Sequence, residues 1–183
     1  MGRAYAETMF SEAAKRLQTR HGSRAQYQRL ADLGESGDAL GSMEREFIAQ
    51  RDTMYIASVT VDGWPYVQHR GGPKGFLSVL DDKTLAFADF AGNKQYITTG
   101  NLETNDRVAL FLIDYPGQGR LKIIGHAKLV EGDATLEAKV RVVGYKAKVE
   151  GVMVFAVTAF DWNCSQHITQ RRTKEEIEGG AGP

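Results

Sequence analysis

The spacing of hydrophobic positions along this chain changes near residue 53. In the first part, apolar residues 10, 13, 14 and 17 stand at i, i+3, i+4 and i+7, which places them on one face of an α-helix. The same pattern predicts a second helix over Arg24–Ala31. A third, short helix is expected from Ser42, a suitable N-cap, to about Gln50, with acidic residues in its first turn.

From Met54 onward apolar residues recur at every second position, and turn residues interrupt this pattern at short intervals. Asp62-Gly63 is the strongest hairpin signal in the chain. The predicted strands are rich in β-branched and apolar residues, and they cover Met54–Val61, Pro65–Arg70, Phe76–Leu80, Thr84–Ala88, Val108–Asp114, Leu121–Val130 and Val152–Phe160. Short helices are expected between them at Asn93–Leu102 and Thr135–Arg141.

Strands joined by hairpin turns favour an antiparallel barrel or sandwich over a βαβ sheet. The prediction is therefore a mainly β (α+β) fold with one barrel domain and a helical N-terminal extension. The polar, Gly-rich stretch from Glu175 to Pro183 is expected to fray.

Composition and charge argue against several classes of partner and several kinds of site. Among 183 residues, 23 Lys+Arg balance 23 Asp+Glu, and a formal net charge of +0 argues against nucleic acid or an anionic membrane as a partner. No apolar stretch is long enough for a signal peptide or a membrane span, so a cytoplasmic protein is expected. A single cysteine and four dispersed histidines exclude an intrachain disulfide and make a metal centre improbable.

The densest candidate for chemistry is the run QHRGGPKGF at 68–76. Its glycines let backbone approach a ligand closely, and Arg70 suits bidentate recognition of phosphate. The alternative is a surface bulge with ordinary solvated cations. The run lacks the strand–loop–helix context of a P-loop or a dinucleotide fingerprint.

Two further segments are candidates. Asp89–Lys94 lies between a strand end and a predicted helix start, where free N–H groups favour an anion, although Asn93 could simply cap the helix. Trp162–Arg172 follows the last strand and concentrates hydrogen-bonding side chains, which suit a ligand, a helix cap or a dimer contact. Cys164 has His167 and Arg171 nearby, but a nucleophile role also needs a base and an oxyanion hole.

Four runs together resemble the pyridoxamine 5′-phosphate oxidase-related family of FMN-binding split barrels, in an uncharacterised flavin-binding subgroup. Residues 44–131 carry the resemblance well, and the segment to about 172 carries it more loosely. The runs are MYIASVTVDGWPYVQHRGGP at 54–73, TLAFADFAGNK at 84–94, NLETNDRVALFLID at 101–114 and LKIIGHA at 121–127.

The resemblance implies a six- to seven-stranded antiparallel Greek-key split β-barrel that forms a homodimer with FMN at the interface. The implied domains are a helical extension at 1–43, the barrel at 44–172 and a flexible tail at 173–183. It places the cofactor-binding residues at Gln68, His69, Arg70, Gly71, Ala88, Asp89, Asn93, Lys94, Arg120, Trp162, Gln166, His167 and Arg171.

Two departures from the oxidase pattern matter. Asn93-Lys94 stands where the oxidase has an Arg-Lys pair on the phosphate, and Arg70 is the candidate to replace the lost cation. The oxidase's C-terminal Trp and Arg-x-His substrate motif have only Trp162, His167 and Arg171 as nearest types, at different spacing. Oxidation of pyridoxamine phosphate is therefore not expected.

The expected function is an FMN-dependent oxidoreductase that transfers hydride through flavin N5 to or from a small-molecule substrate, with NAD(P)H as a candidate reductant. Such chemistry requires no side-chain nucleophile and no metal. The alternatives are a haem-binding protein with His126 or His167 as axial ligand, a non-catalytic flavin carrier, and a deazaflavin enzyme.

Overall fold

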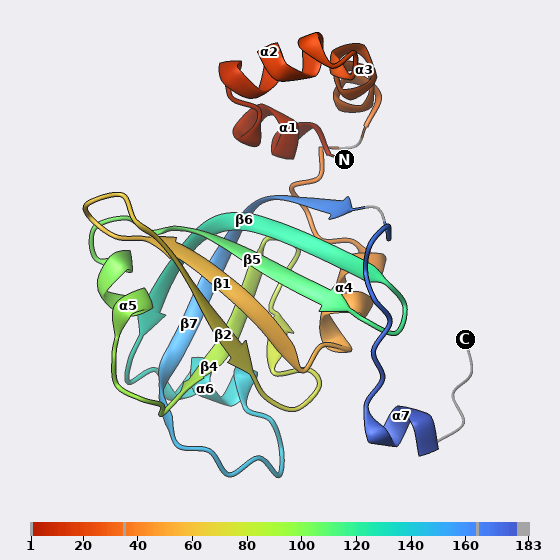
Figure 1. Cartoon of the computed structure of the whole chain (residues 1–183). Coiled ribbons are helices and arrows are strands. Elements are labelled where there is room, and N and C mark those ends of the chain that lie inside the picture. The colour runs from red at the N-terminus through yellow and green to blue at the C-terminus, as the bar shows by residue number, and fades with distance from the viewer. Residues whose placement is uncertain (1, 35, 164, 179–183) are drawn as a thin grey trace.

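The computed structural model describes residues 2–34, 36–163 and 165–178 (Figure 1). In chain order, the helices are α1 (Arg3–Met9), α2 (Glu12–Arg20), α3 (Arg24–Leu33), α4 (Ser42–Ala49), α5 (Ile97–Leu102), α6 (Ala134–Val140) and α7 (Lys174–Glu178). The strands are β1 (Thr53–Val59), β2 (Pro65–Gly71), β3 (Leu77–Val79), β4 (Thr84–Phe90), β5 (Arg107–Asp114), β6 (Gly119–Val130) and β7 (Val149–Asn163).

All seven strands belong to one antiparallel sheet with the order β2-β1-β5-β6-β7-β4-β3. This confirms the predicted mainly β split-barrel fold. The sheet curls around a core but does not close, because β2 and β3 are its two edges and neither is hydrogen-bonded to the other. Figure 1 shows β1, β2 and β5 running across one face of the molecule without a helix over them.

The core follows the alternation that predicted the strands. Every second residue of β1 is buried, including Met54 and Ile56, and these pack with residues from β4, β5, β6 and β7. Ile48 of α4 is fully buried in the same cluster, so α4 covers one end of the barrel. A smaller apolar cluster lies where α6 packs on β4 and β7.

The N-terminal extension contains three helices rather than the two predicted. The expected first helix is α2, and α1, which precedes it, was not predicted. Ser11, whose hydroxyl accepts the Ala14 N–H at 3.1 Å, caps α2 and separates it from α1. Tyr5 of α1 is buried against β6 and β7, with the Lys122 Nζ 4.7 Å from its ring centroid. The linker joins the barrel through the Phe160 N–H, which donates to the Gly37 carbonyl at 2.8 Å.

Two other helix boundaries differ from the prediction. Gly41, not Ser42, is the N-cap of α4, and the Glu44 carboxylate accepts the Gly41 N–H at 3.0 Å. The C-terminal segment holds the short helix α7 at Lys174–Glu178, while residues 179–183 of the expected tail lie outside the described residues. Within the part of the chain that the structure describes, no helix has the length and apolarity needed to cross a membrane.

One glycine is required by the long pairing of β6 with β7. The register shifts between Ile124 and Gly125, so that Thr158 bulges out of the ladder. A Cβ on Gly125 would stand 2.0 Å from the Ala156 carbonyl oxygen, which is a backbone atom that cannot move alone. The bulge therefore requires glycine at position 125, because any side chain there would collide with the backbone of β7.

We expect Gly125→Ala to lower the free energy of unfolding by about 2–3 kcal/mol, because the added methyl group displaces backbone in the core sheet. Urea unfolding followed by circular dichroism would show a midpoint lower by about 1 M or more. Gly100→Ala is the matched control, since a Cβ on that α5 glycine meets nothing within 4 Å. Equal midpoints for the two variants would contradict the prediction.

Candidate functional site

A polar cavity of about 270 Å³ lies where the barrel is split, between β2 and the end of β4. The loop after β4 and the first turn of α5 form one side of it, and Glu150 of β7 adds a carboxylate. The fold thus brings together two segments that the sequence singled out separately. Six of the predicted site residues line this cavity: Gln68, His69, Arg70, Asp89, Asn93 and Lys94.

An ion pair between Arg70 and Asp89 occupies the cavity. Arg70 Nη1 lies 2.9 Å from Asp89 Oδ1, and the two side chains are only 19% and 11% exposed. This contact is a charge pair without a well-aligned hydrogen bond, because Asp89 Oδ1 and the buried Arg70 Nε both lack a hydrogen-bond partner in the described structure. Burial raises the pKa of Asp89, Arg70 lowers it in opposition, and the negative charge of Glu150 raises it further.

The loop between β4 and α5 differs from the prediction. The helix begins at Ile97 rather than Asn93, because Lys94 and Tyr96 adopt left-handed backbone conformations with φ of 57° and 52°. Asn93 Oδ1 accepts the Gln95 N–H at 3.2 Å, so this residue shapes a turn and does not cap the helix. The predicted helix start at Asn93 is therefore wrong, and the exposed Lys94 lines the cavity from a loop.

Alternation along β2 divides the first predicted segment between two faces. Arg70 and Gln68 are paired with Met54 and Ile56 and share the inward face with them. His69 is on the outer face at the cavity rim, with Nε2 2.6 Å from Thr53 Oγ1.

Two small predicted residues do not line the cavity. Gly71 lies beside it, where a Cβ would stand 3.0 Å from both the His69 ring and the Asp52 carbonyl oxygen. Ala88 is buried on the other side of β4 and lines a separate cavity of about 540 Å³ next to α6.

Thr98 is a site residue that the sequence reading missed. It is 1% exposed, and its hydroxyl donates to Gln68 Oε1 at 2.7 Å, which ties α5 to β2. A neighbouring buried bond, from Asn101 Nδ2 to Ser58 Oγ at 2.9 Å, ties the same helix to β1. The sequence signal that could have identified Thr98 is a short helix whose buried positions hold polar residues rather than apolar ones.

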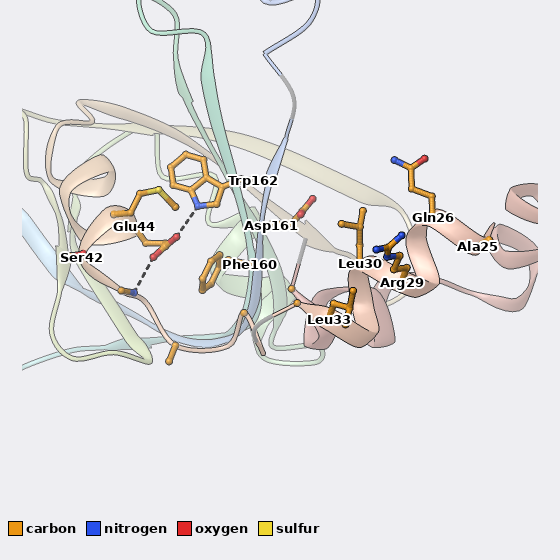
Figure 2. Close-up of a pocket in the computed structure, with 16 residues that line it drawn as sticks. Ala25, Gln26, Arg29, Leu30, Leu33, Ser42, Glu44, Phe160, Asp161 and Trp162 are labelled. Atoms are coloured by element: carbon orange, nitrogen blue, oxygen red, sulfur yellow. Dashed lines mark hydrogen bonds between the residues drawn. The ribbon is translucent and has the colours of Figure 1, made fainter. Parts of the chain in front are cut away.

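The remaining predicted residues belong to a second group at the opposite end of β7. Trp162 donates its Nε1–H to Glu44 Oε1 at 2.7 Å and packs edge-on against Phe47. Figure 2 shows Trp162 beside Phe160 in a cavity of about 890 Å³, with Leu30 and Arg29 of α3 on the other side. Trp162 is thus part of the junction between the barrel and its N-terminal extension.

The other members of this group lie near the turn between β5 and β6. Arg120 is paired with Ile113 and Asn163, and no partner accepts its buried Nε–H among the described residues. The Arg171 guanidinium lies 4.9 Å from the Tyr115 ring centroid. Gln166 and His167 are exposed in the same C-terminal segment. None of the five residues of this second group lines the Arg70 cavity.

The haem alternative rested on two histidines. His126 is half-exposed, with Nδ1 2.9 Å from Asp106 Oδ1, and His167 is exposed with a φ of 65°. Neither side chain enters an apolar cavity of the described structure. Cys164 lies outside the described residues.

Comparison with known proteins agrees with this architecture. The family model described as pyridoxamine 5′-phosphate oxidase matches residues 43–163. The chain belongs to this family. The match begins at α4 and ends with β7, so α1–α3 lie outside it. No curated protein matches the chain.

Solved structures show the same fold at low sequence identity. HupZ of Group A Streptococcus has a TM-score of 0.56 and 17% identity, with 73% of this chain and 100% of that one covered. A predicted pyridoxamine 5′-phosphate oxidase from Lactobacillus delbrueckii has a TM-score of 0.53 and 19% identity, with 68% and 94% covered. At such identities the likeness concerns the fold alone.

The Arg70 cavity fits the phosphate end of a flavin nucleotide. Arg70 Nε is a buried N–H donor for which the described structure shows no acceptor, and a phosphate oxygen would satisfy it. Lys94 adds a second cation and Thr98 a hydroxyl at the same cavity. A volume of about 270 Å³ is smaller than most cofactor sites, so the cavity suits a phosphate and not a whole flavin.

We expect Thr98→Val, which keeps the shape but removes the hydroxyl, to lower the free energy of unfolding by about 1 kcal/mol, because Gln68 Oε1 loses its buried donor. Hydrogen exchange of α5 amides should become faster as the helix loosens from β2. Thr99→Val is the control, since Thr99 lines the same cavity and its side chain has no hydrogen bond to any residue that the structure describes. A similar effect of both variants would contradict the role given to Thr98.

Proposed function

We propose that this protein binds FMN and acts as a flavin-dependent oxidoreductase on a small-molecule substrate. The observation that carries the proposal is the buried, incompletely paired Arg70 beside Lys94 in a member of the pyridoxamine 5′-phosphate oxidase family. Arginine and lysine are the side chains that proteins use to hold phosphate. Lys94 keeps the lysine of the family's Arg-Lys pair, and Arg70 takes the place of the arginine that Asn93 replaces.

In this proposal Arg70 and Lys94 hold the phosphate, and the Gln68–Thr98 hydrogen bond keeps α5 in place beside it. When bound, the flavin supplies the redox chemistry through its N5 atom. The protein contributes binding, orientation and exclusion of water. NAD(P)H is the candidate reductant. Because the flavin carries the redox chemistry, no side chain is assigned the role of a nucleophile.

The isoalloxazine ring requires a surface beyond the small cavity. The outer face of β1, β2 and β5 is available, since Tyr55 and Phe111 are half-exposed and Val67 is 60% exposed. Apolar area of this kind is typical of a protein interface. We therefore propose a homodimer with FMN between the subunits. The Trp162 group, which lies away from the cavity, can join the site only from a second copy.

The first test is whether the purified protein retains FMN after incubation and desalting, measured by its visible absorption spectrum. We expect a retained two-banded flavin spectrum. Lys94→Ala should weaken FMN binding about 10- to 100-fold, because one charge-assisted contact contributes about 1.5–3 kcal/mol. Lys128→Ala is the control, since Lys128 is exposed on β6 away from the cavity.

Three results would overturn the cofactor assignment. One is a colourless protein that retains no FMN. Another is a sharp Soret band on addition of haem in place of flavin retention. The third is tighter binding of a deazaflavin than of FMN. Equal FMN affinity of Lys94→Ala and Lys128→Ala would leave the cofactor in place and refute the phosphate site.

Sedimentation velocity at micromolar concentration tests the dimer. We expect a species of twice the 20.2 kDa chain mass, because the apolar outer face of β1, β2 and β5 is then covered. Val67→Lys should shift the equilibrium toward the monomer by placing a charge in that face, and Lys128→Ala should not. A wild-type monomer at these concentrations would refute the interface and the shared flavin site.

A further inference from the structure

The cavity assigned to phosphate also contains negative charge. Asp89 is 8% exposed and pairs with Arg70 at 2.9 Å, and the Glu150 carboxylate lines the same cavity. A phosphate dianion that takes Arg70 would leave Asp89 buried without its cation. Buried carboxylates in that position are strongly destabilised unless they are paired or become neutral.

We propose that Asp89 is a charge-balancing residue of this site, which takes up one proton when an anionic phosphate displaces it from Arg70. The inference rests on the proposed FMN function. One proton from solvent forms an O–H bond on the Asp89 carboxyl group, while Arg70 stays charged and transfers its contact to the phosphate. No electron moves in this step.

The surroundings of Asp89 favour protonation there rather than elsewhere. The charged groups that face it are Arg70 from β2, Glu150 from β7 and Lys94 from the loop after β4. Burial already raises the pKa of Asp89 and Glu150 raises it further, so that Arg70 alone holds it down. When the phosphate takes Arg70, that lowering influence weakens and a second negative charge arrives. Both changes raise the pKa further.

Two neighbours are less suited to accept the proton. Glu150 is more exposed than Asp89, so water stabilises its charge. His69 lies at the rim on the outer face of β2, where its Nε2 contacts Thr53 Oγ1. The free hydrogen-bonding capacity at Arg70 Nε supports the exchange of partners, because the guanidinium is not fully satisfied by Asp89.

Isothermal titration calorimetry with FMN, in two buffers of different ionisation enthalpy, counts the protons taken up on binding. At about pH 8 a phosphate with a second pKa near 6 is already dianionic in solution, so any uptake belongs to the protein. We expect uptake approaching about one proton for the wild type, and a Kd that rises up to tenfold per pH unit in that range.

Three variants assign the proton. Asp89→Asn should reduce the uptake to near zero and flatten the pH dependence of the Kd. Glu150→Gln should reduce it in part, since removing that charge lowers the pKa of Asp89. His69→Asn should leave it unchanged. If Asp89→Asn does not fold, the wild-type proton count together with Glu150→Gln and His69→Asn still decides the assignment.

The outcomes separate this inference from the function on which it rests. FMN binding with no proton uptake overturns the inference and leaves the flavin function standing, since the phosphate then joins an intact Arg70–Asp89 pair. Uptake that persists in Asp89→Asn, or that is lost in His69→Asn, also overturns it. If the wild type binds no FMN, both proposals fail together.

Discussion

The ion pair between Arg70 and Asp89 joins two strands that share no backbone hydrogen bonds. β2 is one edge of the sheet, and β4 lies next to β3, the other edge, so the open side of the barrel depends on side chains. Removing one member of a buried ion pair typically costs about 3–5 kcal/mol, because the other charge is left in a poor solvent. The same pair stands in the one polar cavity that combines residues from both predicted segments within the described chain.

Other polar side chains around the split have the same role: they hold in place an element that the hydrogen bonds of the sheet do not reach. The Gln68–Thr98 and Ser58–Asn101 bonds attach α5 to β2 and β1. Since buried polar groups need partners, these bonds also fix the position of α5 against the barrel. The loop that carries Lys94 is then held at one end by β4 and at the other by α5. A cation on a short loop acquires a defined position in this way.

The N-terminal extension adds a structural unit beyond the matched family segment. α1 packs through Tyr5 on the outside of β6 and β7, and the linker after α3 hydrogen-bonds to Phe160. Trp162 and Glu44 meet at this junction. Trp162, which the family resemblance assigned to a cofactor, thus lies where the extension meets the barrel. Its contribution to a flavin site depends on a second copy of the chain, which remains part of the proposal.

Local pattern determined the secondary structure and fold class. The period of two from Met54 and the Asp62-Gly63 turn predicted the strands, because alternation and turn chemistry are properties of neighbouring residues. The same local reading placed a helix start at Asn93, and it failed there because left-handed conformations at Lys94 and Tyr96 delay the helix to Ile97. Only tertiary structure decided that Arg70 meets Asp89, that Thr98 belongs to the site, and that Trp162 lies apart from it. Those contacts depend on how distant strands are ordered in the sheet, and strand order is not written in the spacing of residues along any one strand.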